Sequence, residues 1–390
     1  PGGAGSSPGR SQPAKSSVGD AGEGATTLKN VRPPQTVAPP PTAPRPSQPR
    51  PNQPPAGGGF GGLSVIYAVG SDGRLYSLHL SNGAEYQSPV NFLPPGANAS
   101  GFIIVNSKAY AVTSQSCNGV ANGLWAYDFE AQKVLTWKGN VAGSAGAAFG
   151  GDGTIYLTTG EGAEGTPGTA IVAIDPKTLQ TKSVYTNGRI FVSSPVVFEH
   201  KGKTLVAAAT VDGSIHLVDA ANMSTALNVT PATGKGTAPS SLASWQDRDG
   251  TRWILVAHTG ALPQGFSGTA AKGAILAWKL SEDGSKLLPG WASRDLVSPL
   301  TPTVINGVVI ATAGGEFKSN DNNITPAMRA ARSGKAVVYL LDGATGKELW
   351  SSGTTITSFA RGNALSGGMG QFYLTTYDGM LYAFGFPMEH

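Results

Sequence analysis

The sequence predicts an all-β protein: a seven-bladed β-propeller of four-stranded antiparallel blades, preceded by a Pro/Gly-rich extended N-terminal arm. Three observations lead to this prediction. A short motif recurs every 43 to 63 residues, Asp-Gly pairs separate apolar runs, and the first 55 residues hold 14 of the 28 prolines. Of the 390 residues, 40% are hydrophobic, which is enough to bury a substantial core, and only 13% are charged, which is typical of a turn-rich chain with little helical surface.

The repeat is clearest over residues 340–350, where an apolar run leads through Asp342, Thr345 and Gly346 to Trp350. We call the place of Asp342 the repeat position. It is occupied in turn by His79, Asp128, Asp175, Asp219, Lys279, Asp342 and Gly385, at spacings of 49, 47, 44, 60, 63 and 43 residues. This period accommodates four antiparallel strands of about six residues and their turns, which is one propeller blade. Seven copies therefore predict seven blades.

Turn and strand patterns within the copies agree with hairpins. Asp-Gly stands between apolar runs at 72–73, 212–213 and 378–379, and one strand earlier at 152–153 and 249–250, where glycine supplies the positive φ of a tight turn. Blades open with small residues suited to a crowded centre, as in 193–197 and 298–304. Tryptophans fall later in each copy, so we expect an inter-blade core role for them: Trp125, Trp137, Trp278, Trp291 and Trp350.

Two copies are longer than the others. In the sixth, Thr325 is placed to cap a short surface helix that begins at Pro326. In the fifth, 260–273 is a Gly/Ala/Ser loop. Insertions in repeat proteins commonly decorate one face, so the two loops either define a functional surface or are neutral extensions.

Both ends of the repeat region are expected to lack a strand. Residues 63–90 supply about three strands of the first blade, and residues 363–386 about three of the last. A ring normally removes such an uncovered edge by lending an N-terminal strand to the final blade. The candidates for that strand are the segment 25–31, with Ala25, Thr26, Thr27, Leu28 and Val31, and the Gly-rich 57–62. The loan is made either within one chain or to a neighbouring molecule.

Residues 1–59 form the predicted arm, and residues 60–390 the predicted propeller. No aromatic residue precedes Phe60, so the arm cannot build a core. Prolines such as Pro33 and Pro34 favour polyproline II over 31–55, a stiff spacer of roughly 75 Å at ~3.1 Å per residue. The composition fits a disordered linker to an anchor or upstream domain, and the alternative is an arm that docks on a partner.

The repeat resembles the pyrroloquinoline-quinone (PQQ)-like β-propeller repeat, whose signature is roughly Ala-x-Asp-x-x-Thr-Gly-x-x-x-Trp. Asp342, Thr345, Gly346 and Trp350 match it fully, and the weaker copies cover residues 63–386. The family includes quinoprotein dehydrogenases and non-enzymatic propellers, and the shared motif ties blades together. The resemblance therefore implies a structural role for these four residues and for Asp128, Asp175 and Asp219.

The dehydrogenases of this family would imply a quinone stacked on a tryptophan, an adjacent-cysteine disulfide, a calcium site and an aspartate base. Cys117 is the single cysteine, so that disulfide is absent, and the family's enzymes carry eight blades. No histidine pair has zinc-binding spacing, and no nucleophile elbow or phosphate loop is present, so we expect no catalytic, cofactor or metal residues. The five histidines, expected in strands or at the terminus, are His79, His200, His216, His258 and His390.

Charge adds little to the choice of partner. The net charge of +4 lies in the arm, which has six basic and two acidic residues, and the remainder balances at 22 of each. This distribution argues against a nucleic-acid partner, and no apolar run is long enough to span a membrane. A segment removed before Pro1 is expected, and a secretory signal there would place the chain outside the cell or, alternatively, in the periplasm.

These observations favour a secreted, non-catalytic propeller that acts as a structural subunit and binds copies of itself through the arm, building an extracellular filament or tube. Incomplete terminal blades and a low surface charge motivate this hypothesis. Two alternatives stay open: a monomeric surface or periplasmic scaffold with the arm as a tether, and a PQQ-dependent alcohol or sugar dehydrogenase.

Overall fold

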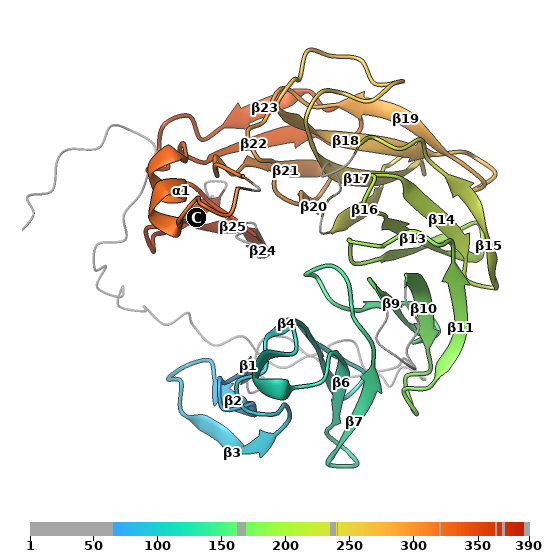
Figure 1. Cartoon of the computed structure of the whole chain (residues 1–390), viewed down its shortest axis with the longest axis vertical. Coiled ribbons are helices and arrows are strands. Elements are labelled where there is room, and N and C mark those ends of the chain that lie inside the picture. The colour runs from blue at the N-terminus through green and yellow to red at the C-terminus, as the bar shows by residue number, and fades with distance from the viewer. Residues whose placement is uncertain are drawn as a thin grey trace, which may run out of the picture. The chain divides into compact units, whose positions relative to one another are not determined.

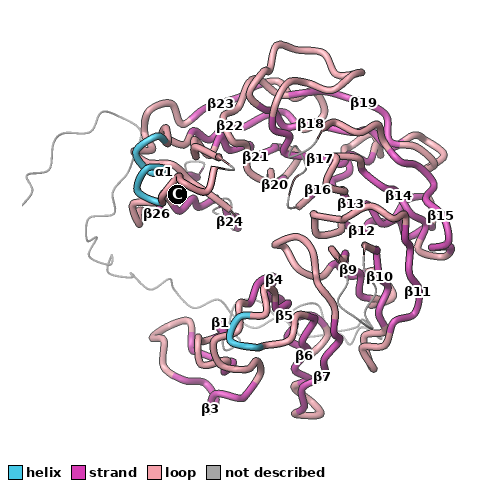
Figure 2. The backbone as a smooth tube through the Cα atoms, viewed as in Figure 1, coloured by secondary structure: helices cyan, strands magenta, loops and turns pink. Residues whose placement is uncertain are grey.

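The computed structural model describes residues 65–161, 169–234, 239, 241–319, 321–362, 365–368 and 371–385. The chain divides into two units, Pro1–Gly62 and Leu63–His390, and all the described residues belong to the second. The described residues of this unit are almost entirely strand and loop, and they include one short helix and one 3-10 turn at Cys117–Gly119 (Figure 2). No described helix has the length and apolarity needed to cross a membrane.

Seven antiparallel sheets follow one another along the chain and surround a common centre (Figure 1). In each sheet the strands pair in sequence order, so every blade is a simple meander. The strands of blades one to three are β1 (Val65–Val69), β2 (Arg74–His79), β3 (Glu85–Asn91); β4 (Ala99–Val105), β5 (Lys108–Thr113), β6 (Gly123–Asp128), β7 (Lys133–Lys138); β8 (Ala148–Phe149), β9 (Ile155–Thr158), β10 (Ala170–Ile174) and β11 (Thr181–Thr186).

The strands of blades four to seven are β12 (Val196–His200), β13 (Lys203–Ala209), β14 (Ile215–Asp219), β15 (Asn222–Val229); β16 (Leu242–Gln246), β17 (Arg252–Thr259), β18 (Gly273–Leu280), β19 (Leu287–Ala292); β20 (Thr303–Ile305), β21 (Val308–Ala313), β22 (Val337–Asp342), β23 (Glu348–Ser351); β24 (Leu365–Gly368), β25 (Gln371–Thr375) and β26 (Leu381–Gly385). The predicted seven-bladed propeller is confirmed, with five complete four-stranded blades.

The two terminal blades have three described strands each, as the sequence predicted. The repeat position identifies which strands are not described, because in complete blades it lies within one residue of the end of the third strand, as Asp128 ends β6 and Asp342 ends β22. In blade one it ends β2, at His79, and in blade seven it ends β26, at Gly385. Among the described residues, blade one therefore has no innermost first strand, and blade seven has no outermost fourth strand.

The core consists of apolar layers between consecutive blades. Six clusters of buried side chains join blade one to two, two to three, and so on to six and seven. Fully or almost fully buried members, from the first interface to the sixth, are Ala109, Leu124, Ile171, Leu205, Leu255 and Leu374. Within the described part of the chain, no such cluster joins blade seven to blade one.

Turn chemistry sets the hairpins as the sequence predicted. Gly213 has φ 79°, a conformation that suits glycine, and its N–H donates to the Thr210 carbonyl at 2.8 Å. The Asp212 carboxylate accepts from the Ser214 amide at 3.1 Å and the Thr210 hydroxyl at 2.8 Å. The predicted helix is also confirmed as α1 (Pro326–Arg332), whose cap Thr325 accepts from the Met328 amide at 3.2 Å.

Blades three and four enclose a buried histidine. His216 in β14 is 2% exposed and packs against the ring of Phe191. The Tyr185 hydroxyl lies 2.9 Å from its Nδ1. Burial lowers the pKa of His216 to about 4, so the imidazole is neutral in the folded protein at neutral pH.

This burial predicts a loss of stability in mild acid. An unfolded histidine takes up a proton near pH 6.5, whereas folded His216 does so only near pH 4. Between those values the unfolded chain binds more protons, so the free energy of unfolding should fall by up to about 3 kcal/mol and level off below pH 4. Urea unfolding at pH 7 and 4.5 measures the effect, and His216→Gln should reduce the difference. An unchanged pH dependence in that variant would contradict the assignment.

Candidate functional site

Aspartates at the repeat position close the turn between the third and fourth strands. Asp342 accepts from the Thr345 amide at 2.9 Å and the Thr345 hydroxyl at 2.7 Å, and Asp175 accepts from Thr178 in the same way, at 2.9 and 3.1 Å. The Asp128 carboxylate accepts from the Ala131 amide at 2.9 Å, and the Asp219 carboxylate accepts from the Ala221 amide at 2.9 Å. These hydrogen bonds lower the pKa of Asp342, Asp175 and Asp128, so the carboxylates are ionised turn anchors.

The same turn receives a tryptophan from the preceding blade. Trp291 of β19 is 8% exposed, and its indole N–H donates to the Gly343 carbonyl at 3.0 Å. Its ring also covers Gly346, where an added Cβ would lie 2.3 Å from Trp291 Cε3. The fourth strand of blade five is thereby fixed to the turn of blade six.

Trp350 has the same place in β23 but lacks this environment. Its register partner Leu340 stands two residues before the repeat position, as Ala277 does for Trp291. Trp350 is 42% exposed, and its ring contacts Phe384 at 5.7 Å between centroids. The expected core role is therefore wrong for Trp350, because the described residues place no fourth strand beside it in blade seven. Trp137, Trp278 and Trp291 are buried as expected, and Trp125 is partly buried.

At the ends of the propeller, two strand edges have no partner strand among residues 65–385 that the structure describes. The third strands β10 and β14 are almost wholly buried, whereas in β26 every described residue is exposed or partly exposed, with Leu381 at 62%. Second strands such as β9 and most of β13 are also buried, whereas every residue of β1 is exposed or partly exposed, with Ile66 at 46%. We call these the β26 edge and the β1 edge.

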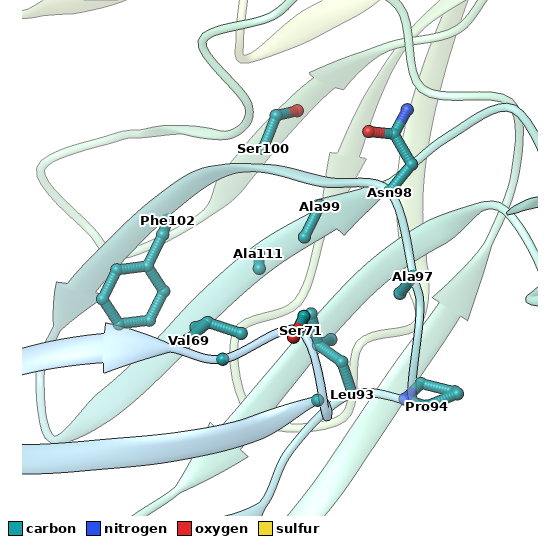
Figure 3. A pocket seen from close by; sticks show the side chains of 12 residues that line it. Val69, Ser71, Leu93, Pro94, Ala97, Asn98, Ala99, Ser100, Phe102 and Ala111 are labelled. Carbon is teal, nitrogen blue, oxygen red and sulfur yellow. The ribbon is translucent and has the colours of Figure 1, made fainter. Parts of the chain in front are cut away.

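A cavity of about 400 Å³ adjoins the β1 edge (Figure 3). Its walls include Val69 at the end of β1, Leu93 and Pro94 on the connection between β3 and β4, and Phe102 of β4. Gly70, which also lines it, precedes the Asp72-Gly73 turn as Thr210 precedes its own Asp-Gly turn. In blade four, Thr210 pairs with Phe191, ahead of the first strand. The cavity therefore lies beside Gly70, the position that in blade four pairs with the segment leading into the first strand.

The two long loops open on one face, since both connect a second strand to a third strand. In blade six the loop is held by Glu316, which is 7% exposed and lies 3.6 Å from Arg361 and 3.9 Å from Arg329 of α1. In blade five the Asp295 carboxylate accepts amide hydrogen bonds from the loop's end, including one from Lys272 at 2.7 Å. These polar groups stabilise the loops, and whether the loops form a functional surface stays a prediction.

The histidines and the arm residues singled out in the sequence can be placed as follows in the chain. His79, His200, His216 and His258 lie in strands, and His258 Nε2 lies 2.8 Å from the Ala261 carbonyl. His390 and the arm residues Ala25, Thr26, Thr27, Leu28, Val31, Pro33 and Pro34, with the segment 57–62, lie outside the described residues. Across the described ranges, no group of three His, Cys, Asp or Glu side chains is placed to hold a metal ion.

Comparison with known proteins yields structural likenesses only. No family model matches the sequence, and no curated protein matches it. BamB from Moraxella catarrhalis is 16% identical with a TM-score of 0.49, covering 84% of this chain and 82% of that one. A europium-containing methanol dehydrogenase is 13% identical (TM-score 0.47, 83% and 72% covered), and the Dos1 propeller 9% (0.45, 80% and 70%). The strand pairing alone establishes the propeller, and no activity follows from these likenesses.

The tryptophan contact predicts unequal effects of two glycine substitutions. Gly346 (φ 71°) and Gly83 (φ 70°) occupy the same turn in blades six and one, each donating to the repeat-position carbonyl at 2.8 Å. An added Cβ meets nothing within 4 Å at Gly83 but meets Trp291 at Gly346. Gly83→Ala should cost roughly 1 kcal/mol from backbone strain, and Gly346→Ala roughly 2–4 kcal/mol because of the added clash. Urea unfolding measures both, and equal losses would show that the contact is unimportant.

Proposed function

We propose that this protein is a non-catalytic structural subunit that assembles with copies of itself through its N-terminal arm, at the cell surface or outside the cell. One observation carries the proposal: each terminal blade has a strand edge that no described strand covers, and exposed apolar side chains lie at both ends. Leu381, Trp350 and Leu349 at one end, and Ile66 at the other, are each more than 40% exposed. Such edges are covered in most native proteins, because unpaired backbone groups recruit other strands.

The charge balance supports self-association. Outside the arm, 22 basic residues balance 22 acidic ones, so copies of the propeller do not repel each other strongly. Contacts between an arm and a distant edge are head-to-tail, and these propagate into filaments unless they close a ring.

The polar side chains of the propeller support a passive role. Asp342 and its counterparts close turns, Glu316 binds two arginines, and His216 is held inside an interface. Each has a packing partner that accounts for its position. These contacts support a scaffold role, in which the strand edges and the loops would bind partners.

Removing the arm tests this function. The full chain should form multimers, and deletion of residues 1–59 should leave folded monomers, because the docking segment is lost. Light scattering after size exclusion and electron microscopy measure assembly, and near-UV circular dichroism checks the fold. A matched control replaces residues 33–55 by a Gly/Ser segment of equal length, which keeps segment 25–31.

Two outcomes would contradict the proposal. Assembly of the truncated chain to the same extent would show that the arm is not the contact. A full-length chain that stays monomeric would instead favour the monomeric scaffold, with the arm as a tether.

A further inference from the structure

We propose that the β26 edge accepts residues 25–31 from a second copy of the chain as the fourth strand of blade seven. This inference rests on the proposed self-assembly and specifies its junction: one acceptor edge, one donor segment, and donation between molecules. Four observations support it.

The first is the direction of the backbone groups of β26. In blade six the Asp342 amide donates outward to the Lys347 carbonyl at 2.8 Å, and the Val338 carbonyl accepts from the Ser352 amide at 2.8 Å. Ile275 of blade five, four residues before its repeat position, accepts from Ser293 in the same way at 2.9 Å. Alternate residues of a third strand therefore bond the fourth strand. Their counterparts in β26 are Leu381, Ala383 and Gly385.

The second observation is the exposure of those positions. Val338 and Ile275 are both 0% exposed, because they lie in the apolar clusters that join their blades to the next blade, whereas their counterpart Leu381 is 62% exposed. The β26 edge thus combines backbone groups that no described strand pairs with an apolar side chain whose counterparts are buried between blades. An added strand would supply the hydrogen bonds, as in other cases of β-augmentation, and the second copy that brings it would supply apolar surface against Leu381.

The third observation is the pair of unused contacts beside the missing strand. Trp291 is covered by the next blade, but Trp350 faces blade seven at 42% exposed. Gly346 receives the Trp291 ring from the preceding fourth strand, but no atom occupies the corresponding space at Gly83 in blade one. A fourth strand of blade seven is the element that, by the blade order, adjoins the turn at Gly83.

The fourth observation concerns the donor. Proline cannot donate a ladder hydrogen bond, and between Pro33 and Pro55 no proline-free run exceeds four residues. Residues 14–32 contain no proline, and within them 25–31 gathers Thr26, Thr27, Leu28 and Val31, which suit a strand. Residues 57–62 are five glycines and a phenylalanine, a poor strand composition.

Connection length favours donation to a second copy. Between complete and terminal blades alike, 7 to 13 residues connect a fourth strand to the next first strand, from 92–98 to 352–364. Suppose that segment 25–31 were the fourth strand of blade seven and that 57–62 were the first strand of blade one in the same chain. Residues 32–56 would then connect the two strands, which is a connection of 25 residues. Its prolines favour an extended spacer with roughly 75 Å of reach. That reach suits a neighbouring molecule.

Mixing two damaged copies tests donation between molecules. Leu28→Pro removes the donor strand, and Ala383→Pro removes an outward amide of the acceptor while the inward-facing residues still pair with β25. Each variant alone should be monomeric. An equimolar mixture should form 1:1 dimers and nothing larger, because only the arm of one and the edge of the other remain. Mass photometry measures the species, and Leu28→Ile and Ala383→Val should assemble as the wild type does.

Disulfide trapping gives a second readout that does not depend on proline. Both copies carry Cys117→Ser, so that each has only the cysteine introduced for the experiment. One copy carries Ala383→Cys, and the other carries a single cysteine at one of positions 26 to 30. The two are mixed and oxidised. Crosslinked heterodimers should peak at one of these positions, as expected for a fixed register. Equal crosslinking at all five, or none, would overturn the proposed junction.

The two proposals can fail separately. If the wild type assembles and the truncated chain does not, but the mixture gives no dimers, the arm acts at another surface and this junction is wrong. If the wild type is monomeric and Leu28→Pro changes only its stability, the strand is donated within one chain and both proposals fall.

Discussion

Each interface between consecutive blades buries a sheet face of one blade against the next, and between blades five and six the outer strand takes part in the contact. The contact of Trp291 with the turn at Gly343 and Gly346 shows how this is done: the fourth strand of one blade presents an aromatic ring to the turn of the next. The aspartate at the repeat position fixes that turn, so it acts on the interface through the shape of the backbone. The apolar side chains of blades five and six are buried in the same interface as the Trp291 ring.

Much of this architecture follows from local sequence. The Asp-Gly pairs determine where hairpins turn, because only glycine readily adopts the positive φ seen at Gly213. The cap at Thr325 and the proline after it determine where α1 begins. The seven repeat positions determine the number of blades, and their order identifies which strands the terminal blades lack.

The sequence did not predict the exposure of Trp350. A tryptophan at this place in the repeat is buried only if the next blade covers it. The described strands of blade seven leave Trp350 42% exposed. Phe191 and Tyr185 around His216 come from different elements, so no short motif marks that buried site. The cavity beside Gly70 was not predicted for the same reason, since its lining comes from the turn after β1, the connection after β3, and strands β4 and β5. Contacts between distant segments decide all three.

The interfaces also determine how the blades depend on one another for stability. Blades two to six each have two apolar interfaces, whereas the described residues give blades one and seven only one. Without closure, the propeller behaves as a linear array in which each unit is stabilised by its nearest neighbours, and such arrays open from their ends. Amide hydrogen exchange in an unassembled molecule would then be fastest in β1 to β3 and β24 to β26 and slowest in blade four. Covering either end would slow exchange far from the contact itself, so that association acts as a clamp on the whole array.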